Sequence, residues 1–387
     1  MMDINAQLKI IKRGAVDIVS EEELRLKLKE GRPLIVKAGF DPTAADLHLG
    51  HTVLLRKLRQ FQELGHKVKF LIGDFTARIG DPTGRSQLRK QLSKEEVQKN
   101  AETYCNQVAQ ILAINKIEVV YNSTWLEKLS VTDMLGRIFS KGTVSQMLAR
   151  EEFRKRLDLH QEISLLEFIY PLLQGYDSVE LKADVEVGGK DQIFNLLIGR
   201  AMQKDEDQPS QVVITMPLLE GTDGVQKMSK SYDNYIGISE PAGDMFGKLM
   251  SISDELMFKY YELLTDEDMA AVRLMHPKDA KVRLAKLITA EFHGNDAGEA
   301  AADEFGRVFS RKEVPQDAPV HKLAQGGERV IEVIIACGLA GTKNEARRLL
   351  EQGGVSFNGE RISTEEALLS SEGILKVGKR RFLKLQL

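Results

Sequence analysis

The sequence predicts an α/β chain in three parts: a domain built on a parallel β-sheet, then an α-helical region, then a small α+β domain. In the first part, short apolar runs alternate with segments of helical periodicity, which is typical of a parallel sheet with right-handed crossovers. Residues 244–307 have helical periodicity almost throughout. The proline-containing segment 314–319 then indicates a linker.

We assign the three parts the following boundaries. The sheet domain comprises residues 1–222, with a helical insertion near 126–166, and the helical region comprises 223–313. After the linker, residues 320–387 form a unit near the lower size limit for independent folding. With 387 residues, the chain is long enough for this division.

Capping residues and apolar runs place the elements of the sheet domain. Ser20, with Glu23 three residues later, marks the start of one helix, and Gly65 marks the end of another. The segment 39–43 is expected to turn the chain, and 126–176 is expected to be mostly helical. Helices are expected at 21–30, 52–64 and 93–112. Strands are expected at 34–36, 68–72, 117–121, 185–187 and 212–216.

The composition is that of an ordinary globular protein, with 42% apolar and 29% charged residues. A net charge of −3 excludes a uniformly basic nucleic-acid binder. Residues 320–387, however, hold 11 Lys and Arg against 8 Asp and Glu, which points to a polyanionic partner for this part. A mixed solvated surface is the alternative explanation.

The sequence also bears on the cellular compartment. Cys105 and Cys337 match no metal or redox spacing, and they fit a reducing environment. The N-terminal residues are charged and no apolar run reaches the length of a membrane span, so we expect no signal peptide and no membrane association. Together these features predict a cytoplasmic protein.

The string His48-Leu49-Gly50-His51 opens a predicted helix after a strand. Free backbone N–H groups and the helix dipole favour a phosphate there, and two neutral imidazoles on one face can donate hydrogen bonds to it. Gly50 leaves no Cβ in the way of an adenine ring or ribose. A zinc site is a poor alternative because no further His or Cys stands close by. Two ordinary histidines at a helix start are the other alternative.

The string Lys227-Met228-Ser229-Lys230-Ser231 brings two ammonium groups that can meet the charge on a leaving pyrophosphate. Gly221 and Gly224, just upstream, would give the segment the flexibility of a closing lid. Met228 is a candidate for the apolar side chain that seats the loop. A solvated lysine loop is the alternative.

Three polar or aromatic residues share one face of a predicted helix. Tyr170, Gln174 and Asp177 are spaced four and three apart, so they project together. An apolar stripe would be the simplest explanation, but Gln and Asp are poor core residues without polar partners. An aromatic ring, an amide and a carboxylate suit a zwitterionic aromatic ligand.

Two polar turns follow predicted strands. In Gly188-Gly189-Lys190-Asp191-Gln192 the glycines let backbone approach a ribose, and Asp191 can accept its hydroxyls. The turn GDPTG, which contains Asp81, lies at the carboxyl end of another strand, where open parallel sheets place their ligands.

With these motifs in view, the chain resembles the bacterial tyrosyl-tRNA synthetases over essentially its full length. These are class I aminoacyl-tRNA synthetases with a Rossmann-like catalytic domain. The resemblance rests on the runs GFDPTAADLHLGH, GDPTG, YPLLQGYD, GGKDQ and KMSKS. It implies activation of L-tyrosine with ATP, which carries Mg²⁺, and transfer of tyrosine to the 3′-terminal adenosine of tRNA(Tyr). It further implies a homodimer formed through the helical insertion, and no structural metal bound by the protein.

The resemblance also implies a role for each matching residue. Asp177 would accept the phenolic hydroxyl of the substrate. Its ammonium group would be held by Tyr170, Gln174 and Asp81. The aminoacyl-adenylate would be lined by Gly39, Asp41 and Gln192. The ribose and adenine side of ATP would meet Gly50, Gly189 and Asp191. The phosphates and pyrophosphate would meet Thr43, His48, His51, Lys227 and Lys230.

One position departs from the family pattern. Many members carry a tyrosine two residues before the glycine that matches Gly39, and that tyrosine helps to read the substrate hydroxyl. Lys37 stands there in this chain. We interpret it as the mark of a sub-branch, which leaves Asp177 as the one specificity residue that we expect.

The tail resembles the small alpha-L RNA-binding module found in a ribosomal small-subunit protein and in pseudouridine synthases. The matching run is 333–359. Lys343, Arg347 and Arg348 fall on or near one helical face, where they could bind a phosphate backbone. A second basic cluster is formed by Lys379, Arg380 and Arg381. A solvated basic helix is the alternative.

Three other functions compete with this interpretation. A tryptophanyl-tRNA synthetase would share the fold and both signatures, but Gln174, Asp177 and the tail fit tyrosine better. A synthetase-derived RNA-binding protein without catalysis would have no reason to retain His48, His51 and both lysines of KMSKS. A different nucleotidyltransferase of the same superfamily would leave the tail unexplained.

Overall fold

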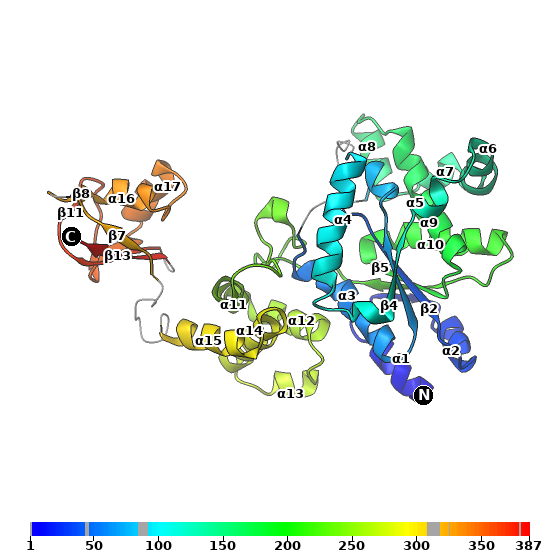
Figure 1. Ribbon diagram of the computed structural model, residues 1–387, viewed down its shortest axis with the longest axis horizontal. Helices are drawn as coiled ribbons and strands as arrows, with labels where there is room; N and C mark the ends of the chain where they lie inside the picture. The colour runs from blue at the N-terminus through cyan, green and yellow to red at the C-terminus, as the bar shows by residue number, and fades with distance from the viewer. Residues whose placement is uncertain (1, 43–45, 84–91, 308–317, 325, 379–380) are drawn as a thin grey trace. The chain divides into compact units, whose positions relative to one another are not determined.

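The computed structural model describes residues 2–42, 46–83, 92–307, 318–324, 326–378 and 381–387 (Figure 1). The chain forms two compact units, residues 1–299 and 300–387, and each is described by itself. The expected boundary near residue 222 stays a prediction. Among the described residues, no helix combines the length and the apolar character needed to cross a lipid bilayer.

The first unit is built on a six-stranded sheet with the order β1-β6-β5-β2-β3-β4. Its neighbours are parallel, except that β1 runs antiparallel to β6 at the edge. The strands are β1 (Asp17–Val19), β2 (Ile35–Phe40), β3 (Lys67–Ile72), β4 (Ile117–Tyr121), β5 (Val185–Gly189) and β6 (Val212–Met216). The parallel sheet and its five expected strands are confirmed. Sequence analysis missed β1, because three residues are too short to show a periodicity.

The turn expected at 39–43 is wrong at its start. Gly39 and Phe40 still belong to β2, where they pair in parallel register with Leu71 and Ile72 of β3. The glycine suggested a turn, but the ladder continues because β3 runs alongside and supplies its hydrogen-bond partners. The strand therefore delivers Asp41 directly to the carboxyl edge of the sheet.

Helices cover both faces of the sheet, with α3 and α4 on one side and α9 and α10 on the other (Figure 1). Ser20 and Glu23 form the expected capping box of α2 (Glu21–Lys29), and Gly65, with φ +88°, follows the end of α3. The helix expected from residue 52 begins earlier, at Leu49. The other helices of this group are α1 (Ile4–Lys12), α3 (Leu49–Glu63), α4 (Lys94–Val108), α9 (Leu165–Leu181) and α10 (Ile193–Asp205).

Several short helices lie between β4 and α9, in the segment predicted to be a helical insertion. Its helices are α5 (Ser123–Leu126), α6 (Val131–Asp133), α7 (Val144–Leu148) and α8 (Glu151–Asp158). Buried side chains from the insertion, among them Ile138, Met147 and Phe153, pack on Leu173 and Tyr176 of α9. The insertion therefore supports the helix that carries the three aligned residues of the predicted ligand site.

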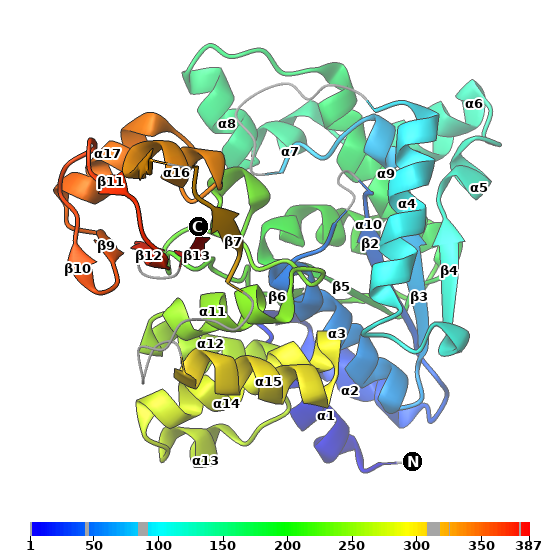
Figure 2. The ribbon, with the colours of Figure 1, turned by 60° about the vertical axis from the view of Figure 1, so that its left-hand side comes forward.

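The helices after β6 pack beside α3 in the same compact unit (Figure 2). They are α11 (Ala242–Ser251), α12 (Asp254–Leu264), α13 (Met269–Arg273) and α14 (Pro277–His293), and α15 (Asn295–Phe305) follows them in the chain. The helical periodicity seen across 244–307 is thus confirmed.

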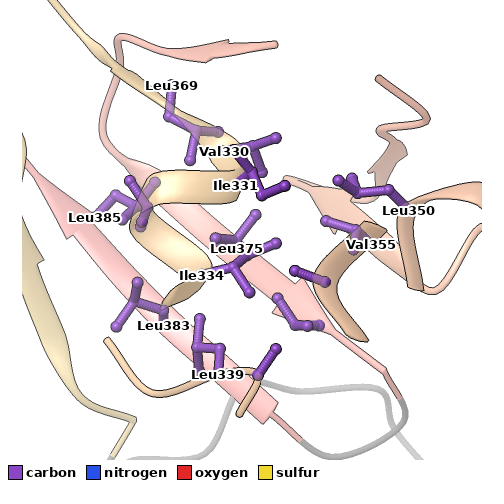
Figure 3. Packing of buried hydrophobic residues seen from close by; sticks show 14 of the residues in the cluster. Val330, Ile331, Ile334, Leu339, Leu350, Val355, Leu369, Leu375, Leu383 and Leu385 are labelled. Carbon is purple, nitrogen blue, oxygen red and sulfur yellow. The ribbon is translucent and has the colours of Figure 1, made fainter. Parts of the chain in front are cut away.

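The second unit is a small α+β fold with its own apolar core (Figure 3). Val330 and Ile334 of α16 and Leu350 of α17 pack on Leu375 and Leu383 of the sheet. The sheet has the order β10-β9-β12-β13-β7, and β8 and β11 form a separate pair. The elements are β7 (Val320–Lys322), β8 (Glu328–Arg329), α16 (Val330–Ala336), α17 (Lys343–Glu351), β9 (Val355–Phe357), β10 (Glu360–Arg361), β11 (Leu368–Leu369), β12 (Gly373–Val377) and β13 (Arg381–Gln386). Most of the expected linker 314–319 lies outside the described residues.

Candidate active site

A polar cavity of about 460 Å³ lies at the carboxyl edge of the sheet, where the strand order reverses between β5 and β2. Open parallel sheets bind their ligands at such a switch point, because helices on opposite faces leave a crevice there. Many of the predicted site residues line this cavity: Gly39, Asp41, His51, Asp81, Tyr170, Gln174, Asp177, Gly189, Gln192 and Lys227. The structure therefore brings together motifs that are far apart in the sequence.

The other described residues predicted for this site lie close to the residues that line the cavity. The imidazole of His48 contacts that of His51, with ring centroids 4.0 Å apart and the planes tilted by 45°, and Asp191 Oδ2 is 4.0 Å from Lys227 Nζ. Gly50 and Lys230 belong to the same helix start and loop. Thr43 lies outside the described residues.

Asp177 is a buried carboxylate whose two oxygens already accept hydrogen bonds. Trp125 Nε1 donates to Oδ1 at 2.9 Å, and Asn122 Nδ2 donates to Oδ2 at 3.2 Å. Burial raises the pKa of Asp177 to about 7, opposed by the charge of Lys37 and by these two donors. Sequence analysis missed Asn122 and Trp125, although both follow a predicted strand, β4, at the same edge of the sheet.

Asp41 is fixed at the end of β2 by two hydroxyl groups. Tyr170 donates to Oδ2 at 2.9 Å and Thr76 donates to Oδ1 at 2.8 Å. A Cβ on Gly73 would lie 2.1 Å from Asp41 Oδ1, so a side chain at the end of β3 would displace this carboxylate. Thr76 and Gly73 were not predicted, but their place directly after a strand was an available signal.

A chain of amide hydrogen bonds holds the polar side chains of α9 and the GGKDQ segment. The buried Asn195 donates from Nδ2 to Gln174 Oε1 and to Gln192 Oε1, each at 2.9 Å. Gln192 Nε2 donates in turn to Asp81 Oδ2 at 2.6 Å. Arg150, which is buried in the insertion, donates to Asn195 Oδ1 at 3.2 Å and so connects the insertion to this series of hydrogen bonds. Asn195 and Arg150 were also missed.

The two histidines form a capping box at the start of α3. His48 Nδ1 accepts from the Gly50 N–H at 3.2 Å, and His51 Nδ1 accepts from the His48 N–H at 3.2 Å. Because each Nδ1 accepts, these hydrogen bonds assign the ring proton to Nε2, where it can be donated outward. Burial lowers the pKa of His51 to about 4 and that of His48 to about 2, so both rings are neutral at pH 7.

Gly50 has a structural role besides the one expected of it, which stays a prediction. A Cβ there would lie 2.9 Å from the imidazole of His48, whose ring folds back over the first turn of α3. The missing side chain thus makes room for the capping histidine.

The lysine loop lies close to the helix start. Lys230 Nζ is 2.8 Å from Asp46 Oδ2 and 5.9 Å from the ring centroid of Tyr235. Met228 is buried, and its N–H donates to the Leu219 carbonyl at 2.7 Å, which fits the seating role expected for this side chain. Each loop ammonium group thus lies near an acidic side chain, Lys227 near Asp191 and Lys230 near Asp46.

A buried asparagine organises this loop. Asn234 Oδ1 accepts from the Ser229 N–H at 2.8 Å, while Nδ2 donates to Asp223 Oδ2 at 2.8 Å and to the Lys227 carbonyl at 3.2 Å. A Cβ on Gly221 would lie 2.2 Å from the Asn234 side chain. Gly221 therefore makes room for Asn234, in addition to any flexibility that it gives the loop.

In the second unit, Lys343, Arg347 and Arg348 are exposed on α17. Arg347 Nε is 2.8 Å from Glu365 Oε2. Arg381 pairs with Glu345 at 3.1 Å and donates to the Leu339 carbonyl, so its guanidinium serves the fold of this unit. Lys379 and Arg380 lie outside the described residues.

The fold is a Rossmann-like α/β architecture, and its cavity gathers a histidine pair at a helix start, a lysine loop and polar side chains of α9. A model of the family "tRNA synthetases class I (W and Y)" matches residues 29–310. The chain is 52% identical to a tyrosine–tRNA ligase of Oleidesulfovibrio alaskensis over 99% of both chains. It is 53% identical to that of Aquifex aeolicus over 98% of both chains. The chain belongs to the class I aminoacyl-tRNA synthetases, in the family of the bacterial tyrosine–tRNA ligases.

Solved structures share the fold. A C-terminally truncated mitochondrial tyrosyl-tRNA synthetase of Aspergillus nidulans matches with a TM-score of 0.66 at 22% identity, covering 80% of this chain and 95% of that one. The enzyme of Archaeoglobus fulgidus, solved with L-tyrosine, matches with a TM-score of 0.63 at 23% identity, covering 78% of this chain and 100% of that one. At these sequence identities, the likeness shows a shared fold and nothing about function.

Proposed function

We propose a route by which this chain ligates tyrosine to tRNA(Tyr) within the cavity described above. The carboxylate of L-tyrosine attacks the α-phosphorus of ATP in line, which gives tyrosyl-adenylate and pyrophosphate. A ribose hydroxyl of the 3′-terminal adenosine of tRNA then takes the tyrosyl group and releases AMP. The first nucleophile is already an anion at neutral pH, so positioning and charge stabilisation replace a general base.

The buried Asp177 carboxylate is the single observation that carries the choice of tyrosine. It lines the cavity together with Tyr170 and Gln174 of the same helix. An ionised carboxylate accepts from several donors, so it takes the phenolic hydroxyl besides its bonds from Asn122 and Trp125. The ammonium group of the substrate is held by Tyr170, Gln174 and Asp81.

The nucleotide occupies the other side of the cavity. His48 and His51 donate from Nε2 to phosphate oxygens, next to the free N–H groups at the start of α3. Lys227 and Lys230 leave their acidic partners to meet the pyrophosphate as it departs. Asp191, next to Gly189, binds the ribose. The adenylate and the ATP phosphates further meet Gly39, Asp41, Thr43 and Gln192.

Mg²⁺ would arrive with ATP. No described residues form a group of three or more His, Cys, Asp or Glu that could hold a metal ion. Phosphate oxygens and water would therefore supply most of its ligands, as is usual for this cation. When bound, the ion would neutralise charge on the phosphates. These substrates meet in the cytoplasm, where we expect the protein to act.

The reaction is tested by exchange of labelled pyrophosphate into ATP without tRNA, with tyrosine, tryptophan and phenylalanine compared side by side. Exchange with tyrosine alone is expected. Exchange with tryptophan would keep the mechanism but contradict the roles of Gln174 and Asp177. No exchange with any of the three would favour an RNA-binding protein without catalysis.

The second unit supplies binding of tRNA in this proposal. Its core is separate, and it presents Lys343, Arg347 and Arg348 at the surface of α17. Deleting residues 320–387 should leave tyrosine-dependent pyrophosphate exchange within about twofold of wild type and lower tRNA charging at least about tenfold, because phosphate contacts dominate nucleic-acid affinity. Exchange and charging kinetics measure the two effects.

A milder variant keeps the unit folded. Replacing Lys343, Arg347 and Arg348 by alanine should weaken tRNA binding and make its dependence on salt concentration less steep. If the deletion lowered exchange and charging equally, the modular interpretation would be wrong.

We propose that two copies of the chain associate through the insertion. Several large apolar side chains are exposed along the insertion and at the start of α9, and exposed apolar surface of this kind favours a protein–protein contact. These are Val131, Leu135, Val144, Leu157, Leu159, Leu165 and Leu166. A second copy would cover them.

Replacing Val144 and Leu165 together by glutamate should convert a dimer into a monomer in sedimentation experiments, since charge would be buried without a partner. Leu274→Glu is the matched control, because Leu274 is 89% exposed outside the insertion. A dimer that survives the double substitution would place the interface elsewhere.

A further inference from the structure

Lys37, the position that departs from the family pattern, is a fully buried lysine of β2. Its ammonium group is 2.8 Å from Glu186 Oε1 of the neighbouring strand β5. Glu186 is only 1% exposed, yet it belongs to the lining of the cavity. A buried ion pair therefore lies next to the proposed tyrosine site, with Glu186 at the cavity and Lys37 behind it.

The same ammonium group holds α9. Lys37 Nζ donates to Ser178 Oγ at 2.8 Å and to the Gln174 carbonyl at 3.2 Å. Ser178 Oγ donates onward to Glu186 Oε2 at 2.9 Å. The three groups close a ring of hydrogen bonds that fixes the middle of α9 against the sheet. Gln174 and Asp177, which face the ligand, lie in this same turn.

Asp177 meets charged or titratable groups from three elements. Lys37 of β2 and Glu186 of β5 act on its carboxylate with opposite signs, and Tyr170 lies about two turns away on α9 itself. Asn122 and Trp125 add neutral donors from the end of β4 and from α5. Lys37 is thus the cation that favours the charged form of this carboxylate against its burial.

We propose that Lys37 and Glu186 are positioning residues for tyrosine recognition, which fix the ligand-facing turn of α9 and together set the charge of Asp177. The inference rests on the proposed binding of tyrosine at Asp177. Lys37 contributes no contact to the substrate hydroxyl. Its positive charge, on the side of α9 that packs against the sheet, keeps Asp177 ionised. The carboxylate can then accept a hydrogen bond from the phenol of the substrate.

A purely structural role is the competing explanation. Buried ion pairs often contribute little net stability, and replacing both partners can be neutral, whereas removing one leaves a buried charge unpaired. Stability measurements alone therefore cannot separate the two roles. The pH dependence of ligand binding can, because the two charges act on Asp177 in opposite directions.

The test measures the affinity for labelled L-tyrosine by equilibrium dialysis from pH 5.5 to 8.5, with the full chain and no ATP. Because the pKa of Asp177 is raised to about 7, wild-type affinity should rise with pH and level off above that value. In Lys37→Met the midpoint of this increase in affinity should lie about one pH unit higher. At pH values below the midpoint, this corresponds to a tenfold weaker affinity for tyrosine. In Glu186→Gln the midpoint should lie at a lower pH than in the wild-type chain.

Three further variants serve as controls. Lys37→Met/Glu186→Gln, which removes both charges, should recover stability and bring the rise back toward wild type. Asp177→Asn should abolish the rise. Lys57→Met removes another buried lysine, whose ammonium group caps carbonyls of Ile10 and Ile11 away from the cavity, and it should leave the rise in place.

Opposite shifts for the two single variants would support the proposal. If the midpoint stayed at the wild-type pH in both single variants, or shifted in the same direction in both, the proposal would be wrong and the ion pair would be purely structural. If Lys37→Met does not fold, Glu186→Gln and the double variant decide the question. A wild-type chain that fails to bind tyrosine would instead contradict the proposed function itself.

Discussion

Replacing Asp177 with asparagine is expected to lower the preference for tyrosine over phenylalanine by about 100-fold, the factor expected for one hydrogen bond to a buried charge. In the wild-type chain, phenylalanine leaves a carboxylate that is 1% exposed without its third donor. An amide carries no charge to desolvate, and its NH₂ group would face the donors Asn122 and Trp125. Activation of tyrosine should therefore fall more than activation of phenylalanine.

Pyrophosphate exchange at several concentrations of each amino acid gives the two kcat/KM values. Asp184→Asn is the matched control, because Asp184 is a buried aspartate paired with Arg32 at the amino end of β5. It should cost stability while the tyrosine preference stays within about twofold. An unchanged preference in Asp177→Asn would refute the assignment of this residue.

The same substitution has a second readout in stability. The folded pKa of Asp177 is raised from 3.8 to about 7, so the native state holds this proton more tightly than the unfolded chain does. This contribution is fully present below pH 3.8 and is lost as the pH rises through about 7. Melting temperatures of Asp177→Asn should therefore fall less steeply between pH 4 and pH 7 than those of the wild-type chain.

Replacing Lys230 with alanine is expected to slow formation of tyrosyl-adenylate by about 100-fold, the usual cost of removing one group that stabilises charge in the transition state. The affinity for tyrosine should stay within about twofold. Lys230 lies on the loop at Asp46, beside the helix start that receives the phosphates, and it is not part of the cavity lining near Asp177.

Single-turnover formation of the adenylate and equilibrium binding of tyrosine separate the two effects. Lys259→Ala is the matched control, since this lysine pairs with Glu220 in the same unit. Its adenylate formation should match that of wild type. Loss of tyrosine affinity in Lys230→Ala equal to the loss of rate would instead mean that the loop shapes the amino acid pocket.

Local signals predicted most of the secondary structure. The capping box at Ser20, the glycine after α3 and the apolar runs of β3, β4 and β6 depend on neighbours within a few residues, so the printed sequence contains the whole signal. The same holds for His48 and His51, which lie one helical turn apart. Where the signal was ambiguous, as at Gly39, the tertiary ladder decided and the chain stayed extended.

The amino-acid sequence identifies the groups that can do the chemistry: two imidazoles at a helix start, two lysines in one loop, and an aromatic, an amide and a carboxylate on one helical face. The tertiary structure decided what those groups do at neutral pH and what holds them. Asn122, Asn195 and Asn234 are ordinary polar residues in the sequence, and their roles follow from partners up to 55 residues away. The role of Lys37 likewise could not be predicted from the sequence. A lysine becomes a buried positioning cation only where folding places Glu186 and Ser178 beside it and removes water from all three.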